Sequence, residues 1–412
     1  MRGSTLLFIT GCLLAIFLSP CHADAELSYQ LEMNNRLDAI VAKGLRVHAY
    51  AGAVLLVARR GEVLHEKAYG YSRKYSSGHE LLDNPQPMTT DTIFDVASLT
   101  KVFATTFGAM LLVDRGEVAL DAPVSKYLPL FDREQKRNIT IRHLLSHRSG
   151  LPPWKPVYCH AASKAEAAAY IATVPLQSPV GAEYHYSDLN FMLLGYVIEA
   201  VSDRSLDRFL DEKLYEPLGL RDTSFHPLRR AGARIAATSE GNPLELGMAT
   251  SEKFGDTCDE NAKVFRSWRR HVLIGEVNDG NAFYAHQGVA GHAGLFSTAA
   301  ELNSLADLLS GRATYRGKSL IRAETVKTFL TPDDLGNGLG WQFRSEVIKA
   351  KDAPAGSFGH TGFTGCNVLI VPDREITIIF LSNRQHEGLV GTESYPKLDA
   401  LRGEIAQTVL SF

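Results

Sequence analysis

The alternation of apolar and polar residues predicts strands near both ends of the chain. Residues 51–58 form an apolar run rich in Val and Leu, and residues 63–71 form a second strand-like run after a short turn that contains Gly61. Two such runs around a glycine-containing turn predict a β-hairpin. Apolar alternation with β-branched residues returns at 366–371 and 376–381, which predicts two further strands.

Helical spacing dominates the middle of the chain. Residues 94–121 carry apolar side chains at this spacing, including Phe103, Phe107 and Met110, and similar patterns occupy 191–202, 206–214, 299–309 and 395–410. Strands at both ends with helices between them predict an α/β fold. We expect one sheet built from about 45–75 and about 340–385, with terminal helices and a mainly helical lobe inserted at about 110–310.

The first residues have the pattern of a secretory signal peptide. Arg2 precedes an apolar run over 6–18, and small residues then lead to Ala23. Such a run is too short to span a bilayer, so we expect cleavage after Ala23, a domain at 24–412 without a transmembrane helix, and a secreted or periplasmic location. Lipid anchoring at Cys21 and a buried N-terminal helix are the alternatives.

Composition narrows the class of protein. The chain has 412 residues, of which 45% are hydrophobic and 22% charged, and a net charge of −3. It lacks the basic excess that nucleic acids and anionic membranes require, so neither is expected as a partner. Beyond the signal peptide, Cys159, Cys258 and Cys366 allow one disulfide that the sequence does not select. We expect the basic cluster within 266–271 to lie on a solvated face.

Three short motifs carry candidate chemistry. Ser98 and Lys101 stand three residues apart at the start of the predicted helix 94–121, a spacing that places them on one helix face. A serine hydroxyl becomes a nucleophile when a nearby base removes its proton, and a desolvated lysine can be that base. The other two motifs are Tyr186-Ser187-Asp188 and His360-Thr361-Gly362.

In this order and at these separations, the motifs resemble the active-site elements of the serine β-lactamase and penicillin-binding protein family. The flanking stretches 144–152, 186–195, 291–298, 338–342 and 381–384 resemble its class C branch, and the likeness extends over about 45–412. The resemblance implies the transpeptidase-like fold, with an antiparallel sheet flanked by helices. It implies no metal or organic cofactor and a small-molecule or peptide substrate.

Each motif then has an expected role. Ser98 would attack a carbonyl, Lys101, kept partly neutral by burial, would accept the proton, and Tyr186 would relay it to the leaving group if Lys101 lowers the pKa of the phenol. By resemblance, the backbone N–H groups of Ser98 and Phe363 would form the oxyanion hole. The substrate-binding residues implied are Asp188, His360, Thr361 and Gly362.

Two departures from the family pattern bear on the substrate. Asp188 stands where many members have Asn, and His360 stands where many have Lys. Because His has an unperturbed pKa of about 6.5, we expect substrate-carboxylate affinity to fall as pH rises through the pKa of His360. Both changes disfavour efficient β-lactam hydrolysis. The stretches 275–282 and 288–297 also resemble a subgroup with members that act on peptidoglycan stem peptides or muropeptides.

The sequence therefore predicts an exported serine hydrolase that forms an acyl-enzyme on an amide, peptide or ester. A peptidoglycan-derived D-Ala peptide or muropeptide is the favoured substrate. A carboxylesterase, a weak β-lactamase and a non-hydrolytic penicillin-binding sensor or scaffold are the alternatives. His143 and His147 have the spacing of a zinc pair, but without a third ligand nearby we expect structural roles for both.

Overall fold

A six-stranded antiparallel sheet joins the two ends of the chain. The computed structural model describes residues 20–250, 258, 265, 267–310, 319–344, 348, 350, 353–392 and 394–412. The sheet has the strand order β3-β2-β1-β10-β9-β8. Its strands are β1 (Gly52–Arg59), β2 (Glu62–Tyr75), β3 (Leu81–Pro87), β8 (Phe358–Thr361), β9 (Asn367–Val371) and β10 (Ile376–Ser382).

The register confirms that both chain ends build the sheet. In the centre β1 pairs with β10, so that Val54 lies opposite Leu381. The predicted hairpin is β1 and β2, and the two predicted C-terminal strands are β9 and β10. The strand β8 lies at the edge of the sheet and carries His360.

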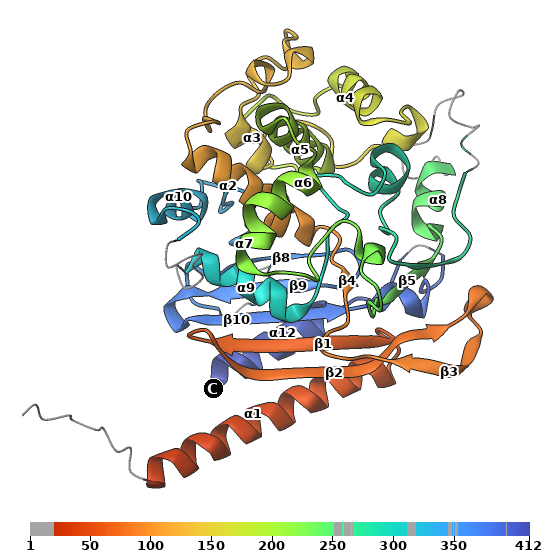
Figure 1. Cartoon of the computed structure of the whole chain (residues 1–412), viewed down its shortest axis with the longest axis vertical. Coiled ribbons are helices and arrows are strands. Elements are labelled where there is room, and N and C mark those ends of the chain that lie inside the picture. Colours follow the sequence, from red (N-terminus) through yellow and green to blue (C-terminus); the bar gives the residue numbers. More distant parts are fainter. Residues whose placement is uncertain are drawn as a thin grey trace, which may run out of the picture.

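Side chains of β1 alternate between two hydrophobic cores, because successive residues of a strand face opposite sides. Val54 and Leu56 belong to the core under the helical lobe, whereas Leu55 and Val57 belong to the core under the terminal helices. Both faces of β1 are therefore buried, which explains its uninterrupted apolar sequence. Figure 1 shows α1 and α12 on one side of the sheet and the other helices on the opposite side.

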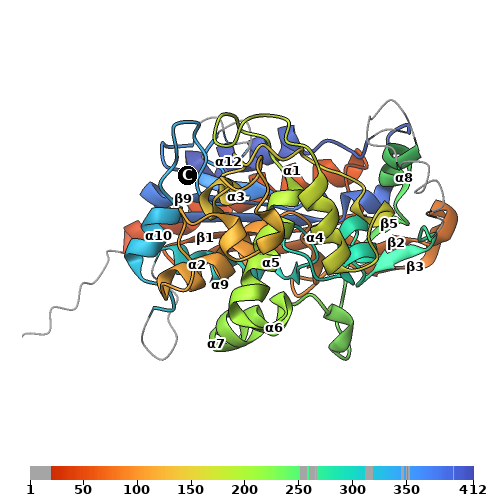
Figure 2. The same cartoon turned by 90° about the horizontal axis from the view of Figure 1, so that it is seen from above.

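The helices and the remaining strands have these bounds: α1 (Pro20–Arg46), α2 (Phe107–Asp114), α3 (Ile141–Leu145), α4 (Lys164–Thr173), α5 (Asp188–Ser202), α6 (Leu206–Leu210), α7 (Glu216–Leu218), α8 (Pro243–Thr250), α9 (Ala299–Leu309), α10 (Ala323–Phe329), α12 (Asp399–Ser411), β4 (Phe94–Asp95), β5 (Ala237–Glu240), β6 (Val272–Ile274) and β7 (Phe296–Ser297). In Figure 2, α5 lies among α2, α3, α4 and α6. This central position explains why ten of its residues are buried.

Two features of the inserted lobe differ from the expectation. It contains two small sheets, formed by β4 with β7 and by β5 with β6. The predicted helix 94–121 is also shorter, because β4 occupies Phe94–Asp95 and α2 ends at Asp114, with the π-helical stretch η2 (Lys101–Thr106) before it. Apolar spacing alone did not separate the short buried strand from the helix that follows.

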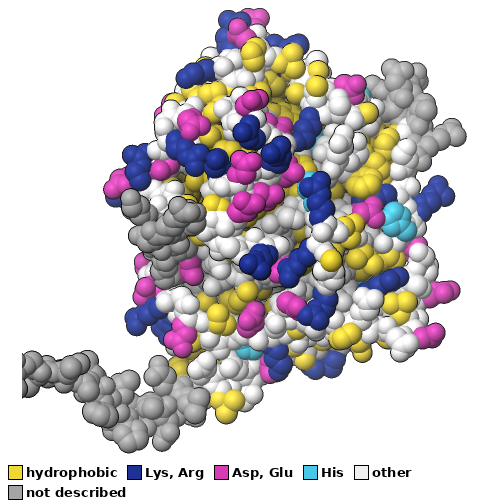
Figure 3. All heavy atoms as spheres, in the orientation of Figure 1, with side chains coloured by type: hydrophobic (Ala, Val, Ile, Leu, Met, Phe, Trp, Pro, Cys, Tyr) yellow, Lys and Arg dark blue, Asp and Glu magenta, His cyan; other side chains and the backbone are white. Residues whose placement is uncertain are grey.

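The predicted signal peptide falls mostly outside the described residues, which begin at Pro20. Its expected cleavage point after Ala23 lies in the first turn of α1. Over the described ranges, no helix is both long enough and apolar enough to cross a membrane. On the face shown in Figure 3, acidic and basic side chains are interspersed, as the near-zero net charge leads one to expect.

Cys159 and Cys258 form a disulfide, and Cys366 is a buried free thiol. The bridge joins residues 99 positions apart in the sequence, at a Cα–Cα distance of 5.8 Å. Such a bridge persists in an oxidising compartment, which agrees with the expected export of the chain.

Candidate active site

Ser98 lies in a tight turn between β4 and the helix that contains Lys101. Ala97, immediately before it, has a φ of 46°, a left-handed conformation that is strained for a residue other than glycine. The side chain of Asp95 stabilises this turn, because its Oδ1 accepts a hydrogen bond of 2.8 Å from the Ala97 amide. The strained turn thus fixes the position of the Ser98 hydroxyl relative to the helix.

Lys101 is fully buried beside Ser98. Its Nζ lies 2.9 Å from Ser98 Oγ, 2.7 Å from Asp188 Oδ1 and 3.1 Å from the His292 carbonyl oxygen. Burial lowers the pKa of Lys101, but the Asp188 carboxylate and the Tyr186 hydroxyl outweigh burial, and the pKa is raised above its ordinary value. The expectation of a partly neutral Lys101 is wrong: the resting site holds an ammonium ion paired with Asp188.

Tyr186 lies over the same lysine. The centre of its ring is 5.0 Å from Lys101 Nζ, 4.6 Å from the ring centre of His147 and 5.8 Å from that of His360. Burial raises the pKa of Tyr186, and the nearby Lys101 charge only partly offsets this effect. The expected lowering of this pKa is therefore wrong, and the phenol keeps its proton.

His360 lies on the edge strand β8 and is 2% exposed. Burial, reinforced by the charge of Lys101, lowers the pKa of His360 to about 3. The neutral ring donates from Nδ1 to the Thr361 carbonyl oxygen at 2.8 Å, so Nε2 is left as an acceptor. Within the described part of the chain, Nε2 has no hydrogen-bond partner. The expected change of charge between pH 5 and 8 is therefore wrong.

The turn after β8 approaches the Ser98 turn closely. A Cβ atom on Gly362 would lie 2.5 Å from the Val96 carbonyl oxygen, so only glycine fits there. The backbone N–H groups of Ser98 and Phe363 donate to no acceptor among the described residues. Two free donors near the serine hydroxyl have the chemistry of an oxyanion site.

These groups line a cavity of about 530 Å³. Ser98, Tyr186, Asp188, His360, Thr361, Gly362 and Phe363 all line it, so the structure brings every residue expected at the site to one cavity except Lys101, which is buried directly behind Ser98. A cavity of this size can hold a drug-sized molecule or a short peptide.

The wall of this cavity carries both acidic and basic side chains. Asp188, Glu245 and Asp279 line it together with Arg344, Arg384 and Arg402. Arg384 is engaged by the carbonyl oxygens of Phe363 and Pro396, and Arg402 donates to the Cys366 carbonyl oxygen. Arg344 lies with its guanidinium carbon 4.1 Å from the centre of the Tyr184 ring. Its Nε has no hydrogen-bond partner in the described ranges.

Several residues of this site escaped the sequence reasoning. Asp95 is 2% exposed and ties the Ser98 turn to Asn278, whose amide donates to Asp95 Oδ2 at 2.6 Å. His147, one of the expected structural histidines, stacks on Tyr186 and accepts from the Ser187 amide at 3.0 Å. In the sequence, each of these two residues stands out only as a polar residue beside apolar ones. Their roles depend on contacts with segments that are distant in the chain, which the sequence does not show.

His143 and His147 do not form a pair. His143 caps α3, where its Nδ1 accepts from the Thr140 amide, while His147 packs under Tyr186. His143 therefore lies at a helix end, as expected of a structural residue, whereas His147 contacts a residue of the candidate site. Over the ranges that the structure describes, no group of three His, Cys, Asp or Glu side chains has the arrangement of a metal site.

A serine hydroxyl beside a buried lysine, with two free amide donors on a transpeptidase-like sheet, is the arrangement expected of serine acyl hydrolases. The sequence model of the Beta-lactamase family matches residues 37–401. The chain therefore belongs to the Beta-lactamase family, and it is a serine hydrolase of that family. The family and fold predicted from the sequence are confirmed.

Relatives and a solved structure agree with this assignment. The chain is 33% identical to an N-acetylmuramyl-L-alanine amidase of Bacillus subtilis (strain 168), over 88% of this chain and 83% of that protein. It is 32% identical to a putative D-alanyl-D-alanine carboxypeptidase of Escherichia coli (strain K12), over 90% of this chain and 86% of that protein. A class C β-lactamase from Rhodobacter sphaeroides has a similar fold, with a TM-score of 0.66, 20% identity, and coverage of 91% of this chain and 99% of that chain.

Proposed function

We propose that the protein is an exported peptidase or amidase that cleaves peptidoglycan-derived peptides through an acyl-enzyme on Ser98. The observation that carries the proposal is the contact of Lys101 Nζ with both Ser98 Oγ (2.9 Å) and Asp188 Oδ1 (2.7 Å) at the wall of a peptide-sized cavity. The names of the two relatives, a muramyl amidase and a putative D-alanyl carboxypeptidase, support a cell-wall substrate. The apolar N-terminal run and the disulfide support export.

Acylation begins with attack by Ser98 Oγ on the carbonyl carbon. The proton of the hydroxyl needs an acceptor, and the Lys101 ammonium ion cannot be one while it holds its own proton. When a bound substrate excludes water from the site, desolvation penalises both charges of the ion pair, so the neutral pair becomes easier to form. Transfer of the Lys101 proton to Asp188 on substrate binding then produces the neutral amine that accepts the Ser98 proton.

The leaving group needs a proton donor, and the oxyanion needs hydrogen-bond donors. Tyr186 keeps its phenolic proton because burial raises its pKa, so it can donate that proton to the departing nitrogen. The phenolate then takes the proton that Lys101 received from Ser98, and Lys101 regains its own proton from Asp188. The N–H groups of Ser98 and Phe363 hydrogen-bond the negative oxygen of the tetrahedral intermediate. Attack of water on the ester of Ser98 then releases the acid and restores the hydroxyl.

The carboxylate of a stem peptide needs a cation, and His360 does not supply one at neutral pH. Arg344 fits this role, because it lines the cavity and one of its nitrogens has no partner in the described chain. The neutral His360 instead offers Nε2 as an acceptor for a substrate N–H or O–H group.

A panel of substrates tests this proposal. The mature enzyme is incubated with D-alanyl-D-alanine peptides, muropeptides with an intact muramyl amide bond, a short-chain p-nitrophenyl ester and nitrocefin, and the products are identified by mass spectrometry. We expect cleavage of a D-alanyl or muramyl amide bond that Ser98→Ala abolishes. Turnover of the ester or nitrocefin alone, or a stable adduct without turnover, would overturn the proposal.

The role of Arg344 is tested by comparing a peptide that has a free C-terminal carboxylate with the same peptide as an amide. Arg344→Gln should raise KM for a peptide with a free C-terminal carboxylate and leave KM for the amidated peptide nearly unchanged. Arg60→Gln is the control, since Arg60 pairs with Glu375 at the β1–β2 turn and does not line the cavity. Equal changes of KM for both peptides would remove Arg344 from this role.

A further inference from the structure

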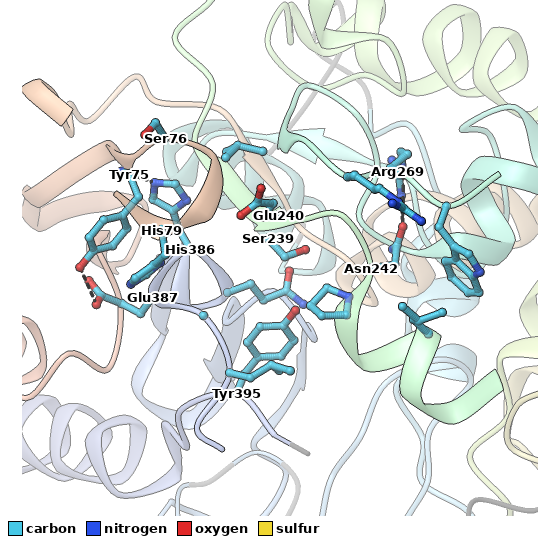
Figure 4. Close-up of a pocket in the computed structure, with 18 of the residues that line it drawn as sticks. Tyr75, Ser76, His79, Ser239, Glu240, Asn242, Arg269, His386, Glu387 and Tyr395 are labelled. Carbon is cyan, nitrogen blue, oxygen red and sulfur yellow. Dashed lines mark hydrogen bonds between the residues drawn. The ribbon is translucent and has the colours of Figure 1, made fainter. Parts of the chain in front are cut away.

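A second cavity has a volume of about 780 Å³, and Figure 4 shows its lining residues. Its wall comes from five parts of the chain: the end of β2 with the turn after it, the end of β5, the start of α8, the segment 268–272 that leads into β6, and the segment that follows β10. In Figure 4, Tyr395, Ser239 and Glu240 lie between the Tyr75 side and the Arg269 side of this cavity.

The two cavities share a wall. Leu244 and Met248 of α8 line the catalytic cavity, whereas Asn242 and Pro243 at the start of the same helix line the second one. Tyr395 of the second cavity packs edge-to-face against Phe363 of the catalytic cavity, with ring centres 5.8 Å apart. A ligand held in the second cavity therefore lies beside the catalytic one.

An unsatisfied amide lines the second cavity. Gln385 is 1% exposed, and within the described chain neither its Nε2 nor its Oε1 has a hydrogen-bond partner. Leaving a buried amide without partners costs free energy, so such a group is rare in native proteins. The neighbouring His386 has partners for both ring nitrogens, at the Tyr75 amide and the Thr238 carbonyl oxygen. The missing partners of Gln385 therefore point to a ligand.

The charges of the wall indicate that this ligand is neutral. Glu387 pairs with Lys74 at 2.9 Å. Arg269, expected to be solvated, is instead 8% exposed and bonds Asn242 and the Val277 carbonyl oxygen. Arg269 also lies 3.7 Å from Glu276, so both buried charges, Glu387 and Arg269, have an opposite charge beside them. The exposed Glu240 and Arg270, which line the same cavity, carry opposite charges.

The aromatic side chains of the wall complete the chemistry. Tyr75, Trp268 and Tyr395 line the same cavity as Gln385. Aromatic rings present apolar faces on which a sugar ring can lie, and the polar ends of tyrosine and tryptophan remain available for hydrogen bonds. A primary amide offers both a donor and an acceptor, which match the C=O and N–H of an acetamido group.

We propose that the second cavity binds the N-acetylated sugar of a peptidoglycan fragment, with Gln385 bonding the acetamido group. The inference rests on the proposed function, because it assigns the glycan part of the same substrate class to this cavity. The peptide part then occupies the catalytic cavity on the other side of α8 and Tyr395.

Direct binding tests the site without turnover. The mature Ser98→Ala protein is titrated calorimetrically with N,N′-diacetylchitobiose and with cellobiose, which lacks acetamido groups. We expect the diacetylated sugar to bind at least about tenfold more tightly, as loss of a buried hydrogen-bonded pair predicts. No binding of diacetylchitobiose, or equal binding of both sugars, would overturn the proposal.

Gln385→Leu separates a ligand-binding role from a structural one. Replacing an unpaired buried amide with an apolar side chain should maintain or raise the thermal midpoint, whereas sugar affinity should fall about tenfold or more. Gln385→Met is the second variant if the first does not fold. Asn303→Leu is the matched control, since Asn303 also has an unpartnered buried oxygen in the described chain but does not line this cavity. Unchanged sugar affinity in the folded Gln385 variants would contradict the assignment.

Kinetics then separate this inference from the proposed function. The ratio of kcat/KM for a muropeptide to that for the same peptide without sugar should fall in Gln385→Leu. A ratio that stays unchanged would remove the sugar site from the reaction. Failure of the wild-type enzyme to cleave the sugar-free peptide and the muropeptide would instead count against the proposed function, while the calorimetric result would still decide the sugar site.

Discussion

The ion pair between Lys101 and Asp188 determines how protons move at this site. In many family members an amide occupies the position of Asp188, and it accepts a lysine proton less readily than a carboxylate does. Here the carboxylate, 2.7 Å from Nζ, raises the pKa of Lys101 against the effect of burial. Lys101 and Asp188 therefore titrate as a pair. The number of protons that the pair holds, and not the protonation of Lys101 alone, would set the pH at which Ser98 becomes reactive.

Asp188→Asn should shift the acid limb of the pH profile of kcat/KM to higher pH. In the wild type the singly protonated pair is competent, because Asp188 takes the proton of Lys101 when substrate binds, whereas the amide of the variant cannot take it. The neutral amine of the variant then forms only above the pKa of Lys101 itself, so the acid limb follows the lysine alone. The profile is measured with a p-nitrophenyl ester, and Asp114→Asn, which breaks the exposed pair with Arg322, is the control. An unmoved acid limb would show that Asp188 does not govern the lysine.

KM for carboxylate substrates should not follow a titration of His360 between pH 5 and 8. Its pKa of about 3 means that the ring is neutral throughout this range. The measurement is KM against pH in the wild type and in His360→Gln. A midpoint near pH 6.5 that is present in the wild type and absent in the variant would contradict the neutral ring.

At the scale of elements, the proposed catalysis depends on the contact between the Ser98 turn and the turn after β8. Gly362 lies against the carbonyl group of Val96 with no space for a Cβ, and the next residue, Ala97, has a strained φ. This contact sets the distance between the Ser98 and Phe363 amides, which belong to chain segments more than 260 residues apart. Packing of these two turns would thus build the proposed oxyanion site.

Gly362→Ala should lower kcat/KM by about 100-fold, the usual effect of losing one oxyanion donor. The added methyl group would meet the Val96 carbonyl oxygen and move the Phe363 amide away from the Ser98 turn. Gly247→Ala is the control, because a Cβ there meets nothing within 4 Å. Rate measurements with a folded Gly362→Ala protein decide the point, and wild-type activity would contradict the geometry.

The elements also show what the sequence could and could not predict. The short apolar runs of β1, β9 and β10, together with the strand-like run of β2, identified the sheet, because strands buried on both faces are apolar throughout. The three motifs identified the side chains that meet at the cavity. The pattern could not show that Lys101 is charged or that His360 is neutral, since both depend on burial and on partners distant in the chain.

At the scale of the whole molecule, the sheet joins both chain ends, and the disulfide links two segments of the inserted lobe. The bridge closes a separation of 99 residues between Cys159 and Cys258, while Cys366 lies buried elsewhere. Cys159 precedes α4, and Cys258 packs against Ala249 of α8, whose residues line both cavities. The bridge therefore connects the wall of the two cavities to the lobe.

Removal of this disulfide should lower stability. A cross-link over such a loop typically contributes about 2–4 kcal/mol, so the double variant Cys159→Ser, Cys258→Ser should unfold at a clearly lower temperature than the oxidised wild type. Thermal unfolding of both proteins, with and without dithiothreitol, makes the comparison. Equal midpoints for the oxidised wild type and the variant would show that the bridge does not stabilise the fold.

The central claim is that Ser98 carries the acyl group during turnover. The most direct measurement is rapid quenching of the enzyme during turnover of a p-nitrophenyl ester, followed by intact-mass and peptide-mapping mass spectrometry. We expect a mass increase equal to the acyl group on the peptide containing Ser98, with no adduct and no turnover in Ser98→Ala. Turnover that persists in Ser98→Ala, or an acyl group on another residue, would contradict it.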